Sequence, residues 1–70
     1  MTDHRIRVTL DEMLERRGMT LTELAAAVDI SLVNMSILKT GKAKAIRFST
    51  LTRICEVLDC QPSDLLAYDP

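Results

Sequence analysis

Residues 21–40 read LTELAAAVDISLVNMSILKT, and their pattern predicts two short helices joined by a tight turn. Apolar residues recur at helical spacing over residues 21–28, which indicates the first helix. Ser31 is a favourable N-cap for a second helix over about residues 32–40. Asp29 lies at the turn between them, where the backbone needs a residue that tolerates positive φ. Two helices joined this closely form a helix-turn-helix, whose second helix can enter the major groove of DNA.

Several positions in this run meet the requirements of that motif. Its fourth and fifth positions need an apolar and a small residue, and they hold Leu24 and Ala25. The residue after the turn needs to be aliphatic and is Ile30. Met35 and Leu38 supply the two inward positions of the second helix. The turn position, which usually holds Gly, is the one departure.

Helix start and stop signals continue along the rest of the chain. TLDE at residues 9–12 and TLTE at residues 20–23 both have the capping-box pattern, and Gly18 and Gly41 are typical helix ends. Ser49 is expected to cap a fourth helix and Pro62 to begin a fifth. The sequence thus predicts an all-α, five-helix bundle as a single domain over residues 1–70, with helices at about 10–17, 21–28, 32–40, 50–58 and 62–66. RIRV at residues 5–8 alternates polar and apolar residues and is compatible with a short strand or an arm.

The composition favours a folded domain without a membrane span. Of the 70 residues, 47% are hydrophobic and 27% are charged, which is too apolar for a disordered chain. No apolar run approaches the roughly 18 residues that a membrane span needs. The N-terminal stretch MTDHRIRV lacks the apolar segment of a signal peptide. We therefore expect a cytoplasmic protein.

The charges are unevenly distributed along the chain. The net charge is −1, yet there is no acidic residue between Asp29 and Glu56. The bases of that acid-free segment are Lys39, Lys42, Lys44, Arg47 and Arg53. The middle of the chain is therefore cationic, which fits either a solvated face or a surface that binds phosphates.

The sequence offers no constellation typical of an enzyme or a metal site. His4 is the single histidine and lies in an N-terminal stretch that we expect to be mobile. Cys55 and Cys60 have no partner ligands at metal-binding spacing, and we expect them to be reduced, partly buried core residues. Both glycines are accounted for as helix ends, so no Gly-rich phosphate loop remains. We expect no catalytic activity, no metal and no cofactor.

Three stretches carry a resemblance to a known family: RGMTLTELAAAVDIS (17–31), LKTGKAKAIRFSTL (38–51) and CEVLDCQPSDLL (55–66). Together they resemble the phage-repressor and Cro-like (XRE) helix-turn-helix family, and in particular its compact single-domain subgroup. The resemblance implies five helices, binding of double-stranded DNA through the third, and commonly a homodimer on a near-palindromic operator.

The resemblance also implies the residues that contact DNA. Base contacts would come from Ser31, Leu32, Val33, Asn34, Ser36 and Ile37. Phosphate contacts would come from Leu21, Thr22, Lys39, Lys42, Lys44 and Arg47. Two features depart from the family pattern. Leu21 stands where a phosphate-binding Gln is common, and the predicted base-reading face has no Arg, Gln or Lys to make bidentate bonds to bases.

Two functional hypotheses follow from these observations. The first is a DNA-binding transcriptional regulator that reads a short operator half-site with the helix at 32–40 and holds phosphates with the basic loop after it. The second is a protein-interaction or antitoxin-like module. It rests on Leu32 and Ile37, which should be exposed because Met35 and Leu38 take the inward positions, and an exposed aliphatic cluster often marks a protein contact.

Overall fold

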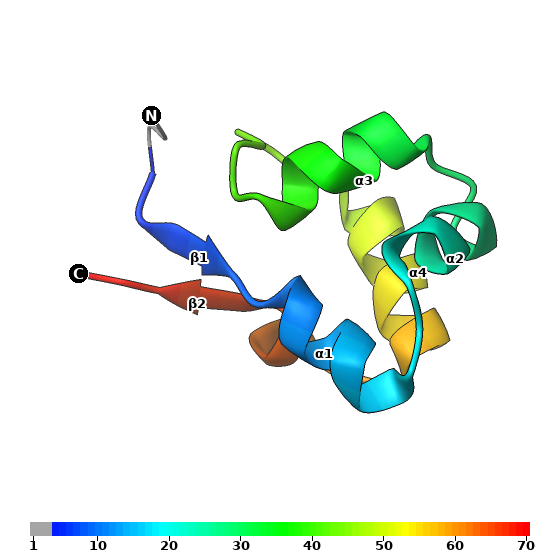
Figure 1. The fold of residues 1–70 in the computed structure, drawn as a ribbon. Coiled ribbons are helices and arrows are strands. Elements are labelled where there is room, and N and C mark those ends of the chain that lie inside the picture. Colours follow the sequence, from blue (N-terminus) through cyan, green and yellow to red (C-terminus); the bar gives the residue numbers. More distant parts are fainter. Residues whose placement is uncertain (1–3) are drawn as a thin grey trace.

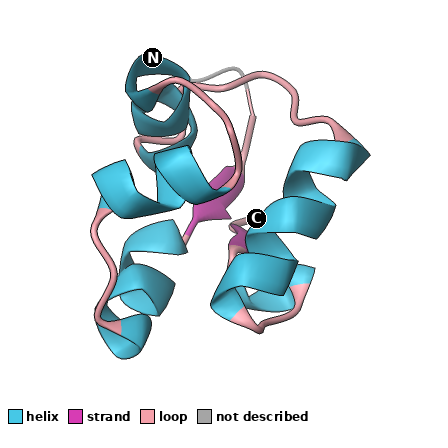
Figure 2. Cartoon of the chain, turned by 90° about the vertical axis from the view of Figure 1, so that its right-hand side faces the viewer, coloured by secondary structure: helices cyan, strands magenta, loops and turns pink. Residues whose placement is uncertain are grey.

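Four α-helices and a small antiparallel sheet make up the fold of the computed structural model, which describes residues 4–70 (Figure 1). Residues 1–3 of the predicted 1–70 domain lie outside the described residues. In chain order the elements are β1 (Ile6–Val8), α1 (Leu10–Arg17), α2 (Leu21–Ala27), α3 (Leu32–Lys39), α4 (Phe48–Leu58), the 3-10 turn η1 (Pro62–Asp64) and β2 (Leu66–Tyr68). Helix is the main secondary structure of the described residues, and the sheet joins segments near the two ends of the chain (Figure 2).

The core is made entirely of apolar side chains drawn from every helix. Its buried residues are Leu10, Met13, Leu14, Leu24, Ala25, Val28, Met35, Ile54, Leu58 and Leu65. No polar or charged side chain is buried among the described residues. Because helices this short are marginal in isolation, burial of these faces against one another supplies most of their stability.

All four helices end in the same way, with one residue in the left-handed conformation. These residues are Gly18 (φ 62°), Asp29 (φ 57°), Gly41 (φ 77°) and Asp59 (φ 50°). In each case the amide that follows bonds to a carbonyl five residues earlier, which is the long hydrogen bond of the Schellman motif. The four bonds are Met19 N–H to Leu14 O (3.0 Å), Ile30 N–H to Ala25 O (3.0 Å), Lys42 N–H to Ile37 O (3.1 Å) and Cys60 N–H to Cys55 O (3.0 Å).

The start of α2 has the predicted capping box. The Thr20 hydroxyl accepts a hydrogen bond from the Glu23 amide at 3.1 Å, and the Glu23 carboxylate accepts one from the Thr20 amide at 3.0 Å. Hydrogen bonds with Thr20 lower the pKa of the Glu23 carboxyl group, because they favour its charged form. The bond with the Thr20 backbone has the larger effect, and the bond with its side chain has the smaller one. Ser31 likewise caps α3 as predicted, accepting from the Asn34 amide at 3.1 Å.

Two other predicted caps are wrong. Thr9 precedes α1, but its side chain makes no cap bond and instead donates to the Asp64 carbonyl at 2.8 Å. Ser49 lies inside α4, which begins at Phe48 with Arg47 as its N-cap. Arg47 has the extended backbone of an N-cap, and its carbonyl accepts the first helical bond from the Leu51 amide at 3.0 Å.

The prediction of an all-α fold with five helices is also wrong. The chain forms a single 3-10 turn at η1 and then extends as β2, which pairs antiparallel with β1 in the register Ile6 to Tyr68 and Val8 to Leu66. This pairing satisfies backbone groups at both ends of the chain, which outweighs one further turn of helix. The RIRV stretch at residues 5–8 therefore contains a short strand, which is one of the two structures that its alternating pattern allowed.

The helix-turn-helix is formed as predicted from residues 21–40. Helices α2 and α3 contact each other and are bent by 119° at the turn between them. Within residues 4–70, no single helix is long and apolar enough to cross a membrane, and only this bent pair reaches the required length and composition in combination.

Replacing Asp29 with Gly should stabilise the protein. Asp29 has φ 57°, where an L-residue is strained and Gly is not, so Asp29→Gly should raise the free energy of unfolding by about 0.5–1 kcal/mol. Thermal or urea unfolding measures the change. Ala26→Gly is the matched control, because Ala26 lies within α2 and Gly there should cost about 1 kcal/mol. A loss of stability in Asp29→Gly would mean that the Asp side chain itself stabilises the turn.

Candidate nucleic-acid interface

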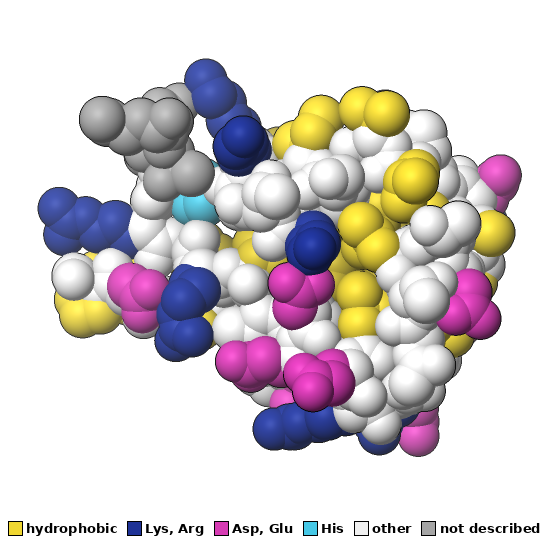
Figure 3. Space-filling model, viewed as in Figure 1, with side chains coloured by type: hydrophobic (Ala, Val, Ile, Leu, Met, Phe, Trp, Pro, Cys, Tyr) yellow, Lys and Arg dark blue, Asp and Glu magenta, His cyan; other side chains and the backbone are white. Residues whose placement is uncertain are grey.

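The outward face of α3 is determined by one inward residue. Met35 is buried at 1% exposure, and Leu38 is half-buried against the core. Residues on the other side of the helix then point to solvent, with exposures of 46% for Leu32, 69% for Val33 and 41% for Ile37. The expected exposure of Leu32 and Ile37 is confirmed. In the space-filling view hydrophobic side chains gather over α3 (Figure 3).

The polar residues of the predicted base-reading set accompany this apolar face. Ser31 and Asn34 are exposed, and Ser36 is half-buried. The Ser31 hydroxyl oxygen already accepts the cap bond, but its proton remains available for donation. The Ser36 carbonyl accepts a bond from the Thr40 hydroxyl at 3.0 Å, close to the end of the helix. The outward face of α3 is thus aliphatic and is accompanied by three small polar groups.

A shallow groove joins α3 to the basic loop at residues 42–47. The groove has a volume of about 540 Å³. Asn34 and Ile37 of α3 line it together with Lys44 and Arg47 of the loop. Apolar side chains that pack against the core, including Met35 and Ile46, form part of its lining. The structure therefore brings members of the predicted base-contacting and phosphate-contacting sets to one surface.

Other residues of the predicted phosphate-contacting set lie around this surface. Lys42 is exposed, as are Lys44 and Arg47. Lys39, in contrast, forms an ion pair with Asp11 of α1 at 3.5 Å. At the start of α2, Thr22 is exposed, while Leu21 is half-buried and packs against the core. Lys42, Lys44 and Arg47 are thus more exposed than the half-buried Lys39.

Arg53 positions the helix-turn-helix, a role that reasoning from sequence missed. Its Nη1 donates to the Val28 carbonyl at 3.3 Å, at the end of α2. A cation at the carbonyl end of a helix satisfies a free acceptor and complements the helix dipole. Arg17 makes the same kind of contact with the end of α4, donating to the Leu58 carbonyl at 2.6 Å. No local pattern signals either bond, since the partners are far apart in sequence.

Two cysteines are the remaining reactive side chains noted in the sequence. Cys55 and Cys60 are both free thiols and partly buried, as predicted. Burial, and then the nearby Cys55, raise the pKa of Cys60, so its thiol is mostly protonated and poorly nucleophilic at neutral pH. Within residues 4–70, no group of three or more His, Cys, Asp or Glu side chains is arranged to hold a metal ion.

Two helices bent by 119°, with the second one exposed beside a cationic loop, define a helix-turn-helix DNA-binding domain. Residues 9–70 match the family of Cro/C1-type HTH DNA-binding domains, and the chain belongs to that family. Among curated proteins, it is 56% identical over 63 residues to an uncharacterized HTH-type transcriptional regulator, YozG, of Bacillus subtilis (strain 168). The match covers 90% of this chain and 75% of YozG.

A solved structure shares the fold. The crystal structure of the transcriptional regulator VanUg, form II, superposes with a TM-score of 0.78 at 30% sequence identity. The superposition covers 100% of this chain and 92% of that of VanUg. The resemblance to the Cro-like family drawn from the sequence is thereby confirmed.

Removal of the Arg53 guanidinium should destabilise the helix-turn-helix. Arg53→Met keeps an apolar stem of similar length but loses the bond to the Val28 carbonyl. We expect a loss of about 1 kcal/mol, which lowers the melting temperature by about 4–8 °C in a domain of this size. Arg16→Met, an exposed position in the last turn of α1, is the control and should change the melting temperature much less. Equal effects of the two substitutions would argue against a role for Arg53 at the turn.

Proposed function

We propose that this protein is a transcriptional regulator that reads a short operator half-site with α3 and holds phosphates with the basic loop at residues 42–47. The groove that joins Asn34 and Ile37 to Lys44 and Arg47 is the observation that supports this most directly. It places groups suited to base edges next to groups suited to the DNA backbone. The relatives named as transcriptional regulators support the same role. We propose that the protein works in the cytoplasm, where such a regulator meets its DNA.

Base reading in this proposal depends on apolar contact. Leu32, Val33 and Ile37 form an exposed aliphatic surface that suits the methyl groups of thymine. Hydrogen bonds to base edges come from Ser31, Asn34 and Ser36, whose small side chains each make one or two bonds. Without Arg or Lys on this face, guanine lacks its usual bidentate partner. We therefore expect a half-site rich in A·T pairs.

Phosphate binding in this proposal depends on the exposed cations that follow α3. Lys42, Lys44 and Arg47 point to solvent and lie within a segment that has no acidic residue. Lys39 contributes after leaving Asp11, an exchange of one exposed ion pair for another that costs little. Leu21 and Thr22 at the start of α2 make the remaining contacts with DNA phosphates. These contacts set the affinity and the register, whereas α3 sets the sequence preference.

The proposal includes a homodimer that forms through the surface of α4. Phe48 is 84% exposed, the highest value among the large hydrophobic residues described. A hollow of about 490 Å³ beside it is lined by Phe48 itself together with Leu51, Cys55 and Pro62. One surface thus carries both a protruding ring and a hollow, and in this proposal a two-fold axis brings the ring of each copy to the hollow of the other. Phe48 directly follows Arg47, so the proposed dimer surface adjoins the proposed DNA-binding groove.

A protein-interaction or antitoxin-like module remains the second candidate, because three exposed aliphatic residues on one helix face also suit a protein partner. Selection of binding sites from random DNA separates the two candidates. The DNA-binding proposal predicts enrichment of a palindromic, A·T-rich motif. Leu32→Asp and Ile37→Asp should abolish that enrichment while the fold persists. The second candidate would be favoured if the wild type bound no DNA at low salt but bound a protein partner that Leu32→Asp and Ile37→Asp both failed to bind.

Lys42 and Lys44 should each account for one phosphate contact. Lys42→Ala and Lys44→Ala should weaken binding to all DNA sequences alike and reduce the slope of log K against log salt by about one each. Fluorescence anisotropy at several salt concentrations measures both effects. Arg16→Ala, on α1, is the matched control with the same loss of charge and should leave the slope unchanged. Slopes that stay at the wild-type value in both Lys variants would rule out the loop as the phosphate site.

Substitution of Phe48 should dissociate the dimer. Phe48→Glu places a charge in an apolar contact and should reduce the mass in solution from two chains to one chain of 7.9 kDa, measured by light scattering. Tyr68→Glu is the control, since Tyr68 is also exposed but lies on β2. If Tyr68→Glu dissociates the dimer and Phe48→Glu does not, the interface is the sheet.

A further inference from the structure

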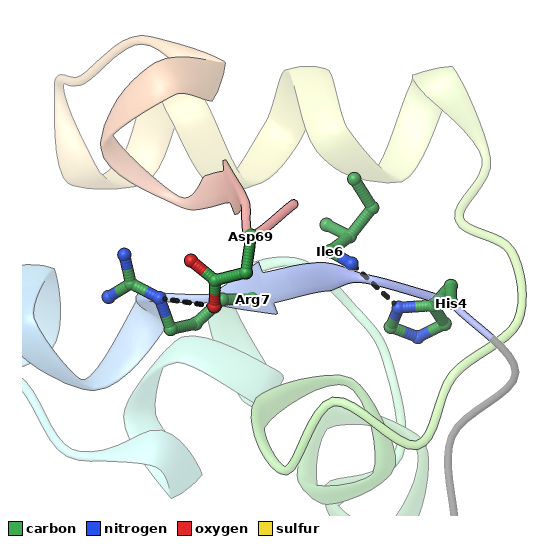
Figure 4. Close-up of polar contacts among 4 residues, drawn as sticks. All are labelled: His4, Ile6, Arg7 and Asp69. Carbon is green, nitrogen blue, oxygen red and sulfur yellow. Dashed lines mark hydrogen bonds and ion pairs between the residues drawn. The ribbon is translucent and has the colours of Figure 1, made fainter.

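His4 uses both of its ring nitrogens to connect the beginning of the chain to the basic loop. Its Nδ1 accepts a hydrogen bond from the Ile6 amide at 3.1 Å (Figure 4). The proton of a neutral imidazole therefore lies on Nε2, which then acts as the donor. Nε2 lies 3.0 Å from the Gly41 carbonyl and 3.0 Å from the Ala43 carbonyl. The expectation that His4 lies in a mobile stretch is wrong, because these three contacts hold it.

The two carbonyls mark the point where α3 ends and the basic loop begins. Gly41 is the left-handed residue that ends α3, and Ala43 lies between Lys42 and Lys44. A bond to both carbonyls therefore restrains the backbone from which these two lysines project. The partners are 37 and 39 residues from His4 along the chain. This is a tertiary tether, not part of a local turn.

The stretch that carries His4 is itself anchored to the sheet. Immediately after it, the Arg5 carbonyl accepts a bond from the Asp69 amide at 2.9 Å, and Arg7 pairs with Asp69 at 3.1 Å (Figure 4). Strands β1 and β2 then pair along their whole length. The tether therefore connects the loop to the paired ends of the chain.

An open pocket lies beside the tether, between the loop and the sheet. The pocket has a volume of about 210 Å³ and is lined by His4, Lys44 and apolar side chains that include Ile6, Ile46 and Leu66. Ile46 packs against the core, whereas Lys42 and Lys44 are exposed and lack the dense van der Waals contacts of a core residue. Directional hydrogen bonds from His4 supply positional restraint at this point.

We propose that His4 is a positioning residue for DNA binding: it holds residues 41–44 so that the backbone of Lys42 and Lys44 is preorganised for phosphate contact. His4 itself touches no DNA in this proposal. The proposal rests on the proposed function of the loop as the phosphate site. Its benefit is that less conformational entropy is lost on binding, because the loop is already ordered.

Replacing His4 with Gln or with Asn distinguishes the contacts of Nε2 from the contact of Nδ1. In His4→Gln the side-chain nitrogen reaches the position of Nε2 and can still donate to the loop. In His4→Asn the shorter side chain retains an acceptor near the Ile6 amide but does not reach the Gly41 and Ala43 carbonyls. Loss of these bonds should weaken DNA binding about 3- to 10-fold in His4→Asn, independently of DNA sequence. His4→Gln should remain within about 2-fold of the wild type.

A double-mutant cycle with Lys44 tests positioning directly. If His4 acts through Lys44, the effect of His4→Asn on DNA affinity should be much smaller when Lys44 is already Ala. A purely structural loss would instead weaken binding equally in both backgrounds. Equal effects in the two backgrounds, or equally weak binding by His4→Gln and His4→Asn, overturn the proposal. Melting temperatures of all variants establish that each one is folded under the assay conditions.

Amide hydrogen exchange on the free protein tests the tether without DNA. The amides of Ala43 and Lys44 should exchange faster in His4→Asn than in the wild type or in His4→Gln. Unchanged exchange in His4→Asn overturns the tether. If the wild type binds no DNA at all, the proposed function fails, and the positioning role fails with it even where the tether persists. If the wild type binds DNA and His4→Asn binds equally well, the positioning role alone fails.

Discussion

The left-handed residue at the end of each helix is the constraint on which this fold depends. Helices of 8, 7, 8 and 11 residues are too short to persist alone, so the chain has to reverse sharply and bring their apolar faces together. After three of the four ends, the next residue packs against the core: Met19, Ile30 and Cys60. After α3 that residue is Lys42, which is exposed. The left-handed residue thus directs the following side chain toward the core at three helix ends, and at the end of α3 it directs the chain into the basic loop.

The rotation of α3 about its axis follows from the same turns. The turn at Asp29 and the burial of Met35 fix the rotation of α3 about its axis. Its aliphatic face therefore points to solvent, although exposing apolar surface to water is unfavourable. A small domain retains such a face when it is used for contact. Arg53 of α4 holds the turn of the helix-turn-helix at Val28, and His4, just before β1, holds the loop that follows α3. Both restraints come from outside the helix-turn-helix itself.

Sequence patterns predicted the features that depend on near neighbours. The capping box at Thr20, the turn at Asp29 and the outward face of α3 all follow from spacings of five residues or fewer, and all are present. The wrong predictions concern contacts between distant segments. Thr9 looks like a cap but bonds to Asp64, and the residues expected as a fifth helix pair with β1. In the candidate site the ion pair of Lys39 with Asp11 escaped notice for the same reason, since no local pattern reports a partner on another helix.

The pairing of β1 with β2 also has a consequence for the order of folding. The paired residues Ile6 and Tyr68 lie near opposite ends of the chain, and closing a flexible loop of that length costs about 3–4 kcal/mol in entropy. Two strands of three residues cannot offset that cost alone. The sheet therefore forms only after the helices have collapsed and brought the two ends close, late on the pathway. Because it closes last, it should also be among the first parts to open, and the histidine tether would then be released while the helices remain packed.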